Sequence, residues 1–353
     1  MRQMNLIVGI LLVFAPIGAW SAPNYPDKTK LLIWRDDAGK EHPVTTAAEW
    51  AKRRAHILDN MQAVMGQLLA AKNKVSLDVQ REEAVKTDKF TRIKLSFAVG
   101  FDDRVPGYLF VPHDLKGKVP GILCSHQTNG NLGSKEPAGL GGSPDLHYAK
   151  HLAERGYVTL AIDYPSFGAY PYDFKKSTFQ SGTMKAIWNN MRAIDLLQAL
   201  PEVDKDRIGG IGHSLGGHNT MYTAAFDERM TALVSNCGFN SFPKYYGGKI
   251  KGWTSDRYMP RIATVYDLKP EKVPFDFPEV VAAFAPRAFL ASAPLRDSNF
   301  EVSGVKDCMN AAGPVYELLG AKEKLAANYP DCAHDFPAEV RRVAYEFLDR
   351  WLK

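Results

Sequence analysis

Three side chains in this chain of 353 residues have the types and the chain order of a hydrolytic centre with a serine nucleophile: Ser214, Asp297 and His334. Ser214 lies in a Gly-x-Ser-x-Gly pattern, between an apolar run and a helical pattern. A strand, a sharp turn and a helix in that order expose a serine hydroxyl on a strained backbone. Gly212 and Gly216 suit such a turn because a side chain at either position would crowd it. We therefore predict that Ser214 is a nucleophile.

Asp297 and His334 each follow a later apolar run, and the stretch between them leaves room for one helix and one strand. Serine, acid and histidine in this chain order form one of the known catalytic triads. His334 would take the proton of Ser214 and return it to the leaving group. Asp297 would orient the imidazole and stabilise the imidazolium. Asp307 and Asp335 are alternative acids. Asp335 directly follows His334, so its side chain would point away from the imidazole. Asp307 lies a helical stretch beyond the loop in which the acid is expected.

The same chemistry needs two backbone N–H groups that stabilise an oxyanion. One comes from the residue after the nucleophile, which is Leu215. The other comes from the loop after the first parallel strand, here residues 125–130. We favour the N–H of Thr128, with Gln127 as the alternative.

Short apolar runs alternate with helical patterns along most of the chain. Before them, residues 92–99 and 108–110 predict an antiparallel hairpin at a sheet edge. The later runs are too apolar to alternate, as expected of strands covered on both faces. They lie at 119–125, 157–163, 207–212, 232–236, 287–293 and 325–329, and the helical patterns at 146–155, 184–200, 215–226 and 338–352. This alternation predicts an α/β fold with a mostly parallel central sheet and helices on both faces.

The N-terminal part predicts an extension of the main domain rather than a module of its own. Thr46 and Glu49 form a capping-box pattern that opens a helix through about Leu69. Its apolar stripe consists of Trp50, Ile57, Met61, Met65 and Leu68. We expect residues 22–90 to form an arm and a helix packed on a main domain of residues 91–353.

One long segment, residues 238–285, lacks a clear strand and is rich in aromatic residues, glycine and proline. A long connection of this kind is often a functional loop. We expect a lid over Ser214, which makes the segment an insertion in the main domain. Candidate substrate-binding residues are the aromatic Trp253 and Tyr258, and Arg257 and Arg261, which could meet an anionic group.

Residues 1–21 have the composition of an export signal. Arg2 precedes a short apolar stretch at 6–14, and small residues follow it. The apolar stretch is too short to cross a bilayer, so a membrane anchor is the weaker interpretation. We predict cleavage before Ala22 and a periplasmic or secreted mature protein.

The chain has four cysteines. Cys124 and Cys237 lie in apolar runs and are expected to be buried thiols. Cys308 and Cys332 lie in regions that a catalytic triad would bring near each other, and an oxidising compartment would permit a disulfide. The sequence leaves this pairing open.

Composition narrows the range of partners. With 45% hydrophobic and 24% charged residues the chain is globular, and its net charge of +5 comes without a basic run, so we expect no nucleic-acid partner. His147 and His151 are one helical turn apart but have no third ligand in view, so we expect a solvated helix face and no metal. No pattern predicts a cofactor, and the oligomeric state stays unknown.

From about residue 92 to 353 the chain resembles the α/β-hydrolase superfamily, particularly its dienelactone-hydrolase-like and acetyl-xylan-esterase-like branches. The resemblance implies an α/β-hydrolase fold and the triad predicted above. Gln127 stands where the loop of acetyl xylan esterases has glycine, and the nucleophile is not the cysteine of true dienelactone hydrolases. The matching motifs are His126-Gln127-Thr128-Asn129-Gly130, Asp163-Tyr164-Pro165, Gly212-His213-Ser214-Leu215-Gly216 and His334-Asp335-Phe336-Pro337.

These patterns predict an exported serine hydrolase that cleaves carboxylic esters through an acyl-enzyme, with an acylated carbohydrate or another small ester as substrate. A prolyl-oligopeptidase-like peptidase is the alternative because it shares the triad order. Such peptidases usually carry a large N-terminal propeller, for which residues 22–90 are too few. A role in binding alone would require a triad that lacks one of its residues, whereas this chain has all three.

Overall fold

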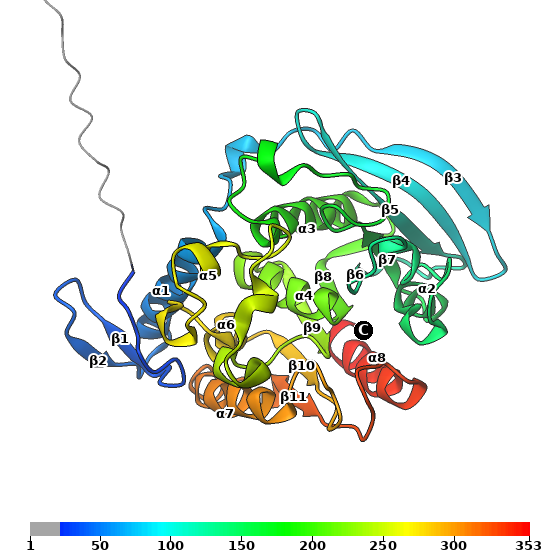
Figure 1. The fold of residues 1–353 in the computed structure, drawn as a ribbon. Coiled ribbons are helices and arrows are strands. Elements are labelled where there is room, and N and C mark those ends of the chain that lie inside the picture. Colours follow the sequence, from blue (N-terminus) through cyan, green and yellow to red (C-terminus); the bar gives the residue numbers. More distant parts are fainter. Residues whose placement is uncertain (1–21) are drawn as a thin grey trace, which may run out of the picture.

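A nine-stranded sheet forms the centre of the computed structural model, which describes residues 22–353 (Figure 1). The predicted signal peptide, residues 1–21, lies outside the described residues. The strands are β3 (Gln80–Lys86), β4 (Phe90–Gly100), β5 (Asp103–Pro112), β6 (Val119–Ser125), β7 (Val158–Ile162), β8 (Val203–His213), β9 (Met230–Asn236), β10 (Ala288–Ser292) and β11 (Leu325–Asn328). Their order in the sheet is β11-β10-β9-β8-β6-β7-β5-β4-β3.

The sheet is parallel from β7 through β11 and antiparallel at its other end, where β3, β4 and β5 pair with one another and β5 pairs with β7. The predicted mostly parallel sheet is confirmed. The predicted hairpin exists as β4 and β5, but its place at the edge is wrong because β3 covers it. Nearly every residue of β3 is exposed, so this strand carries no apolar pattern by which it could be found.

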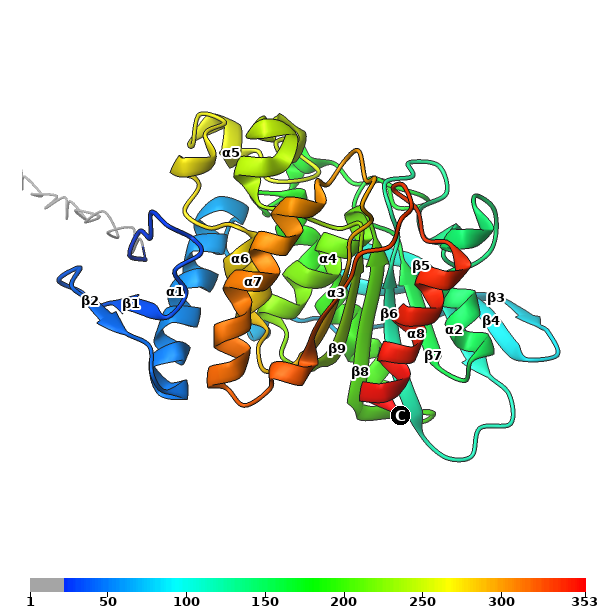
Figure 2. The ribbon, with the colours of Figure 1, turned by 90° about the horizontal axis from the view of Figure 1, so that it is seen from below.

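Helices cover both faces of the sheet, as predicted. They are α1 (Ala47–Met65), α2 (Tyr148–Glu154), α3 (Gly182–Ala199), α4 (Leu215–Phe226), α5 (Arg261–Thr264), α6 (Phe277–Ala283), α7 (Val302–Leu318) and α8 (Ala338–Leu352). Figure 2 shows α2 and α8 on one side, α3, α4, α6 and α7 on the other, and α1 outermost. Within residues 22–353, no helix combines the length and apolar character that a bilayer crossing requires.

The two helical layers bury separate apolar clusters against the sheet. Along β6, Ile122 and Cys124 face the cluster under α2 and α8, whereas Leu123 faces the cluster under α3 and α4. Alternate side chains of a strand point to opposite faces, so a strand that is apolar throughout serves both clusters. This arrangement explains why the parallel strands were visible in the sequence.

The helix α1 begins with the predicted capping box. Thr46 accepts a hydrogen bond from the N–H of Glu49, and the Glu49 carboxylate accepts one from the N–H of Thr46. The helix ends at Met65 rather than near Leu69, because Gly66 takes a φ of 95° that a helix cannot continue. Before the helix, a small ribbon is formed by β1 (Ile33–Arg35) and β2 (Glu41–Pro43).

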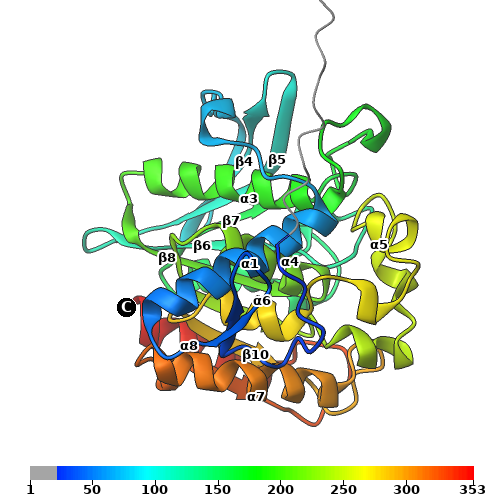
Figure 3. The same ribbon diagram turned by 90° about the vertical axis from the view of Figure 1, so that its left-hand side faces the viewer.

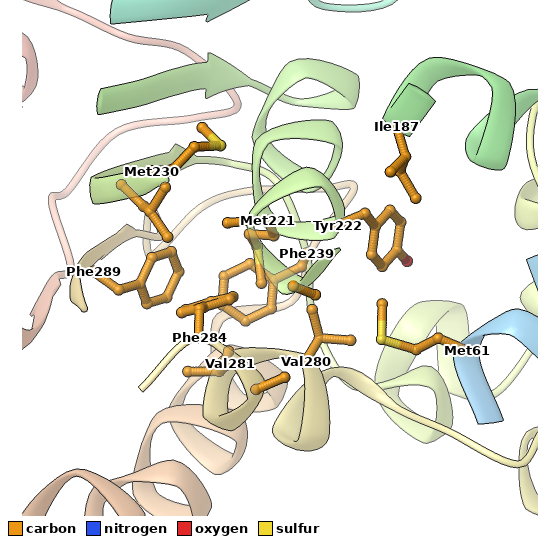
Figure 4. Close-up of a cluster of buried hydrophobic side chains, with 14 of the residues drawn as sticks. Met61, Ile187, Met221, Tyr222, Met230, Phe239, Val280, Val281, Phe284 and Phe289 are labelled. Atoms are coloured by element: carbon orange, nitrogen blue, oxygen red, sulfur yellow. The ribbon is translucent and has the colours of Figure 1, made fainter. Parts of the chain in front are cut away.

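α1 shares the core of the main domain. It crosses the face formed by α4 and α6 (Figure 3). Met61 of α1, Ile187 of α3, Tyr222 of α4 and Val280 of α6 point into one cluster (Figure 4). A buried ion pair between Arg53 of α1 and Glu279 of α6 adds a second link, and both side chains are 0% exposed.

The segment 238–285 contains more regular structure than predicted. Its last part, from Val273 through α6, is buried and belongs to the core between α1 and α7. The description as a lid is therefore wrong for this part. Short helical turns at Phe242–Gly247 and Ile250–Trp253 lie at the end of the sheet where the loops after β10 and β11 emerge (Figure 2).

All four cysteines are free thiols. Cys308 packs in the cluster on the α7 side of the sheet, and Cys332 contacts the cluster on the α8 side. The disulfide that the sequence left open is absent because the two thiols lie against opposite faces.

We predict that Glu279→Ala destabilises the protein by about 3–5 kcal/mol, because it leaves the Arg53 guanidinium buried without a counter-charge. Urea unfolding followed by circular dichroism measures the change. Replacing both partners, as Arg53→Met with Glu279→Leu, should restore the part of the loss that comes from the unpaired charge, but not the hydrogen bond that Glu279 accepts from the N–H of Asp276. Asp206→Ala, which breaks the exposed pair with Lys205, is the control and should have little effect. A similar midpoint for wild type and Glu279→Ala would contradict the prediction.

Candidate active site

Ser214 lies in the sharp turn between β8 and α4. Its φ of 55° and ψ of −119° are strained for a residue with a side chain. The turn is compact because two glycines allow backbones to touch. A Cβ atom on Gly212 would overlap the backbone of Gly216, and a Cβ on Gly216 would overlap the carbonyl oxygen of Ser125. This is the geometry that the sequence pattern predicted for the turn.

Asp297 and His334 lie together at the same end of the sheet, in the loops after β10 and β11. His334 Nδ1 is 2.9 Å from both carboxylate oxygens of Asp297. A carboxylate accepts hydrogen bonds, so Nδ1 carries a proton, and in the neutral imidazole Nε2 then has the free lone pair. Asp297 also accepts hydrogen bonds from the backbone N–H groups of Asn299 and Phe300. These contacts fix both the carboxylate and the imidazole.

The environment of Asp297 keeps it ionised. Burial raises its pKa, but the hydrogen bond and charge of His334 and the two backbone N–H groups outweigh burial and lower the pKa below its usual value. The two alternative acids make other contacts. Asp307 pairs with Lys244 at 2.6 Å, and Asp335 accepts a hydrogen bond from the N–H of Phe336 at 2.7 Å.

A cavity that is open to solvent lies beside Ser214. None of its lining residues is charged. They are Thr128, Ser214, Leu215, His218, Tyr245, Gly252, Trp253, Tyr258, Asn299 and Phe300. The ring of Phe300, one of these residues, lies 6.0 Å from the ring of His334.

The two residues expected to supply oxyanion N–H groups, Leu215 and Thr128, both line this cavity. Gln127 does not, because its side-chain amide donates to the Glu136 carboxylate and the residue is buried. Glu136 also accepts from Asn129 Nδ2 at 2.8 Å, so one carboxylate shapes the loop. Of the two candidates in this loop, Thr128 lines the cavity with Ser214.

The four candidate substrate-binding residues divide into two pairs. Trp253 and Tyr258 line the cavity, and the Tyr258 hydroxyl is 3.3 Å from Thr128 Oγ1. Arg257 and Arg261 do not line it, contrary to expectation. The Arg257 guanidinium bonds to Ser166 at 2.7 Å, and Arg261 lies 3.4 Å from the side-chain oxygen of Gln180. Both arginines point away because they join this segment to the loop before α3.

Outside the segment 238–285, three cavity residues escaped the sequence analysis: His218, Asn299 and Phe300. His218 lies one helical turn after Ser214 on α4, and residues four apart share a helix face. That spacing was a signal in the sequence that could have identified it.

Cys237 lies next to the acid and the histidine. Its sulfur, a carboxylate oxygen of Asp297 and a ring nitrogen of His334 all lie within 4.8 Å of one another. Burial raises the pKa of this thiol well above its ordinary value, so it is neutral. A neutral thiol adds no second negative charge beside Asp297, so the carboxylate can interact with His334 without a competing anion.

Comparison with known proteins identifies the family. A sequence model of the FrsA-like esterases matches residues 18–238, more than half of the chain. The chain belongs to the FrsA-like esterase family. It is a carboxylic ester hydrolase with an α/β-hydrolase fold, as predicted. A second model, of fungal glucuronyl esterases, matches residues 167–320.

Individual relatives extend the comparison. The Bacillus subtilis (strain 168) protein YtaP is 27% identical over 265 residues, which cover 71% of this chain and 84% of YtaP. A glucuronoyl esterase from Solibacter usitatus superposes with a TM-score of 0.72 at 20% identity, over 93% of this chain and 98% of that one. Acetyl xylan esterase 1 from Thermoanaerobacterium sp. JW/SL YS485 superposes with a TM-score of 0.57 at 17% identity, over 84% of this chain and 92% of that one. These superpositions show a shared fold.

We predict that Gly216→Ala lowers both thermal stability and ester turnover, because the new methyl group would displace the Ser125 carbonyl and widen the turn at Ser214. Differential scanning fluorimetry and initial rates with p-nitrophenyl acetate measure the two effects. Gly313→Ala is the matched control, since this helical glycine has open space around it and alanine favours helix. Equal behaviour of the two variants would show that the contact at Gly216 is unimportant.

Proposed function

We propose that this esterase is a serine hydrolase with Ser214 as nucleophile, His334 as general base and Asp297 as the orienting acid. The hydrogen-bonded Asp297–His334 pair, at the sheet edge that also holds the strained Ser214, is the observation that carries the proposal. Leu215 and Thr128 supply the oxyanion N–H groups. Neither N–H donates to an acceptor within residues 22–353, so both are available to a ligand.

The reaction proceeds through an acyl-enzyme. The Ser214 oxygen attacks the ester carbonyl carbon while His334 Nε2 takes its proton. The carbonyl oxygen becomes an oxyanion and accepts hydrogen bonds from Leu215 and Thr128. The imidazolium then protonates the leaving alcohol as the ester bond breaks. Water, deprotonated by His334, attacks the acyl-enzyme and releases the acid and free Ser214.

An exported carbohydrate esterase is the proposed biological setting. The structural relatives named above include glucuronoyl and acetyl xylan esterases, which supports an acylated carbohydrate or related small ester as substrate. The composition of residues 1–21 supports export to the periplasm or beyond the cell. The family matches to esterases favour this function over the peptidase alternative.

We predict that Ser214→Ala lowers kcat for p-nitrophenyl acetate by about 10⁶-fold, as loss of a triad nucleophile does, while the fold remains. Steady-state rates and circular dichroism measure both. A fluorescent phosphonate should label Ser214 in the wild type, as peptide mass spectrometry would report, and leave Ser214→Ala unlabelled. Near-wild-type turnover in a folded variant, or labelling at another residue, would remove Ser214 from the mechanism.

We predict that Asp297→Asn lowers kcat by about 10⁴-fold, because an amide can no longer hold His334 with its proton on Nδ1. Asp307→Asn is the matched control, since its carboxylate pairs with Lys244 at the surface, and should retain most activity. The two variants are compared by kcat with the same ester. Equal losses, or a larger loss in Asp307→Asn, would show that the assignment of Asp297 as the acid is wrong.

A further inference from the structure

The backbone of Thr128 is not held by hydrogen bonds of its own. Within residues 22–353, neither its N–H nor its carbonyl oxygen makes a hydrogen bond. Its side-chain Oγ1 is 3.3 Å from the Tyr258 hydroxyl, a contact that is exposed to solvent. An oxyanion donor acts only if it points in a fixed direction. The direction of the Thr128 N–H must therefore be set by neighbouring residues.

Both neighbours of Thr128 in the chain bond to the same atom, Oε2 of Glu136. The side-chain amide of Gln127 donates to this oxygen, and Asn129 Nδ2 lies 2.8 Å from it. The Asn129 amide has one orientation, because its Oδ1 accepts from the N–H of Leu132 at 3.2 Å. Thr128 is thus the middle residue of a short bridge that is fastened to one carboxylate at both ends.

Glu136 is built into the interior as a carboxylate. It is 4% exposed, and its other oxygen, Oε1, accepts from the N–H of Ser143 at 3.0 Å. Gly142 lies so close that a Cβ atom there would overlap the carboxylate. All three groups that bond to Glu136 are donors, which suits the ionised form. A buried charge needs such donors, so any movement of the two amides leaves it poorly satisfied.

The peptide group that carries the Thr128 N–H is also held at its carbonyl end. This carbonyl belongs to Gln127 and lies 2.6 Å from His126 Nδ1, which donates to it. Nε2 of the same ring accepts from the N–H of Tyr164 at 2.9 Å. The N–H of a planar trans peptide points away from its carbonyl. His126 therefore fixes the plane of this peptide, and Glu136 fixes the residues on both sides of it.

We propose that Glu136 is a positioning residue for ester hydrolysis, because its carboxylate directs the Thr128 N–H at the oxyanion. It is not among the residues that line the cavity and acts through Gln127 and Asn129. The inference rests on the proposed function, in which Thr128 is an oxyanion donor. The oxyanion forms only when the ester carbonyl is attacked, so a misdirected N–H lowers kcat and leaves KM nearly unchanged.

Glu136→Gln in the full-length enzyme tests this role. The change keeps the size of the side chain but puts an NH2 group where a donor has to be accepted. We expect kcat for p-nitrophenyl acetate to fall by about 100-fold or more, the effect of losing one oxyanion donor. KM should change by less than about threefold. Asp145→Asn is the matched control, since this carboxylate follows the same loop but pairs with Arg341, and it should keep the wild-type kcat.

Moving the charge tests whether the contact itself is responsible. Asn129→Asp places a second carboxylate against Glu136, and the two charges repel, so kcat should again fall by about 100-fold or more. Adding Glu136→Gln leaves one charge and supplies an NH2 group that can donate to the new carboxylate. The double variant should therefore regain about tenfold or more in kcat over Asn129→Asp, as expected of residues in direct contact.

Three results would overturn the inference. They are a wild-type kcat in Glu136→Gln, a loss of kcat/KM that comes entirely from KM, and a double variant that recovers nothing. Circular dichroism checks the fold of each variant. If Glu136→Gln does not fold, Asn129→Asp decides alone: a lower kcat at unchanged KM supports the inference, and a wild-type kcat contradicts it. Phosphonate labelling of Ser214 in the wild type tests the proposed function separately.

Discussion

Backbone contact between the start of α4 and the loop after β6 is the constraint on which the site depends. Gly216 lies against the Ser125 carbonyl, and Gly212 lies against Gly216. Only glycine allows these approaches, because any Cβ would occupy the space of a backbone atom. The contact brings the N–H of Leu215 next to the loop that contains Thr128. The two N–H groups thus come from backbones that touch, and neither depends on a flexible side chain.

Support for this contact extends to the outermost layer. α4 packs on α6, and α6 packs on α1. The buried ion pair of Arg53 and Glu279 joins α1 to α6. A buried ion pair contributes little net stability compared with apolar residues of similar volume, but it penalises any arrangement that separates its partners. The N-terminal helix is held in one position relative to the layer behind the site.

The sequence revealed the parallel strands, α4, α8 and the order of the Ser, Asp and His residues because each depends on a strong local pattern. Buried strands are apolar throughout, and the turn at Ser214 requires glycine. β3 escaped because an exposed strand has no such pattern. The short helix α6 was not predicted, although Asp276 and Glu279 form a capping-box pattern that marks its start in the sequence.

The cavity residues were harder to predict than the triad. Arg257 and Arg261 were chosen by charge, but their partners lie in the loop before α3, which no local pattern reveals. Trp253 was chosen because it is aromatic in an irregular segment. Its position beside His218 depends on the path of that whole segment, so it required the three-dimensional structure.

One carboxylate bonds to both ends of residues 242–277, the segment from which Trp253 and Tyr258 line the cavity. Asp276 Oδ1 accepts from the N–H of Phe242 at 2.9 Å, where the segment begins, and from the N–H of Phe277 at 2.7 Å, where α6 begins. The segment is therefore a loop whose ends are already closed. Doubling the length of a flexible loop costs only about 0.6 kcal/mol in closure entropy. Insertions and deletions in the largely exposed stretch 264–272 can therefore accumulate during evolution while the buried parts of the segment and the strands behind Ser214 stay unchanged.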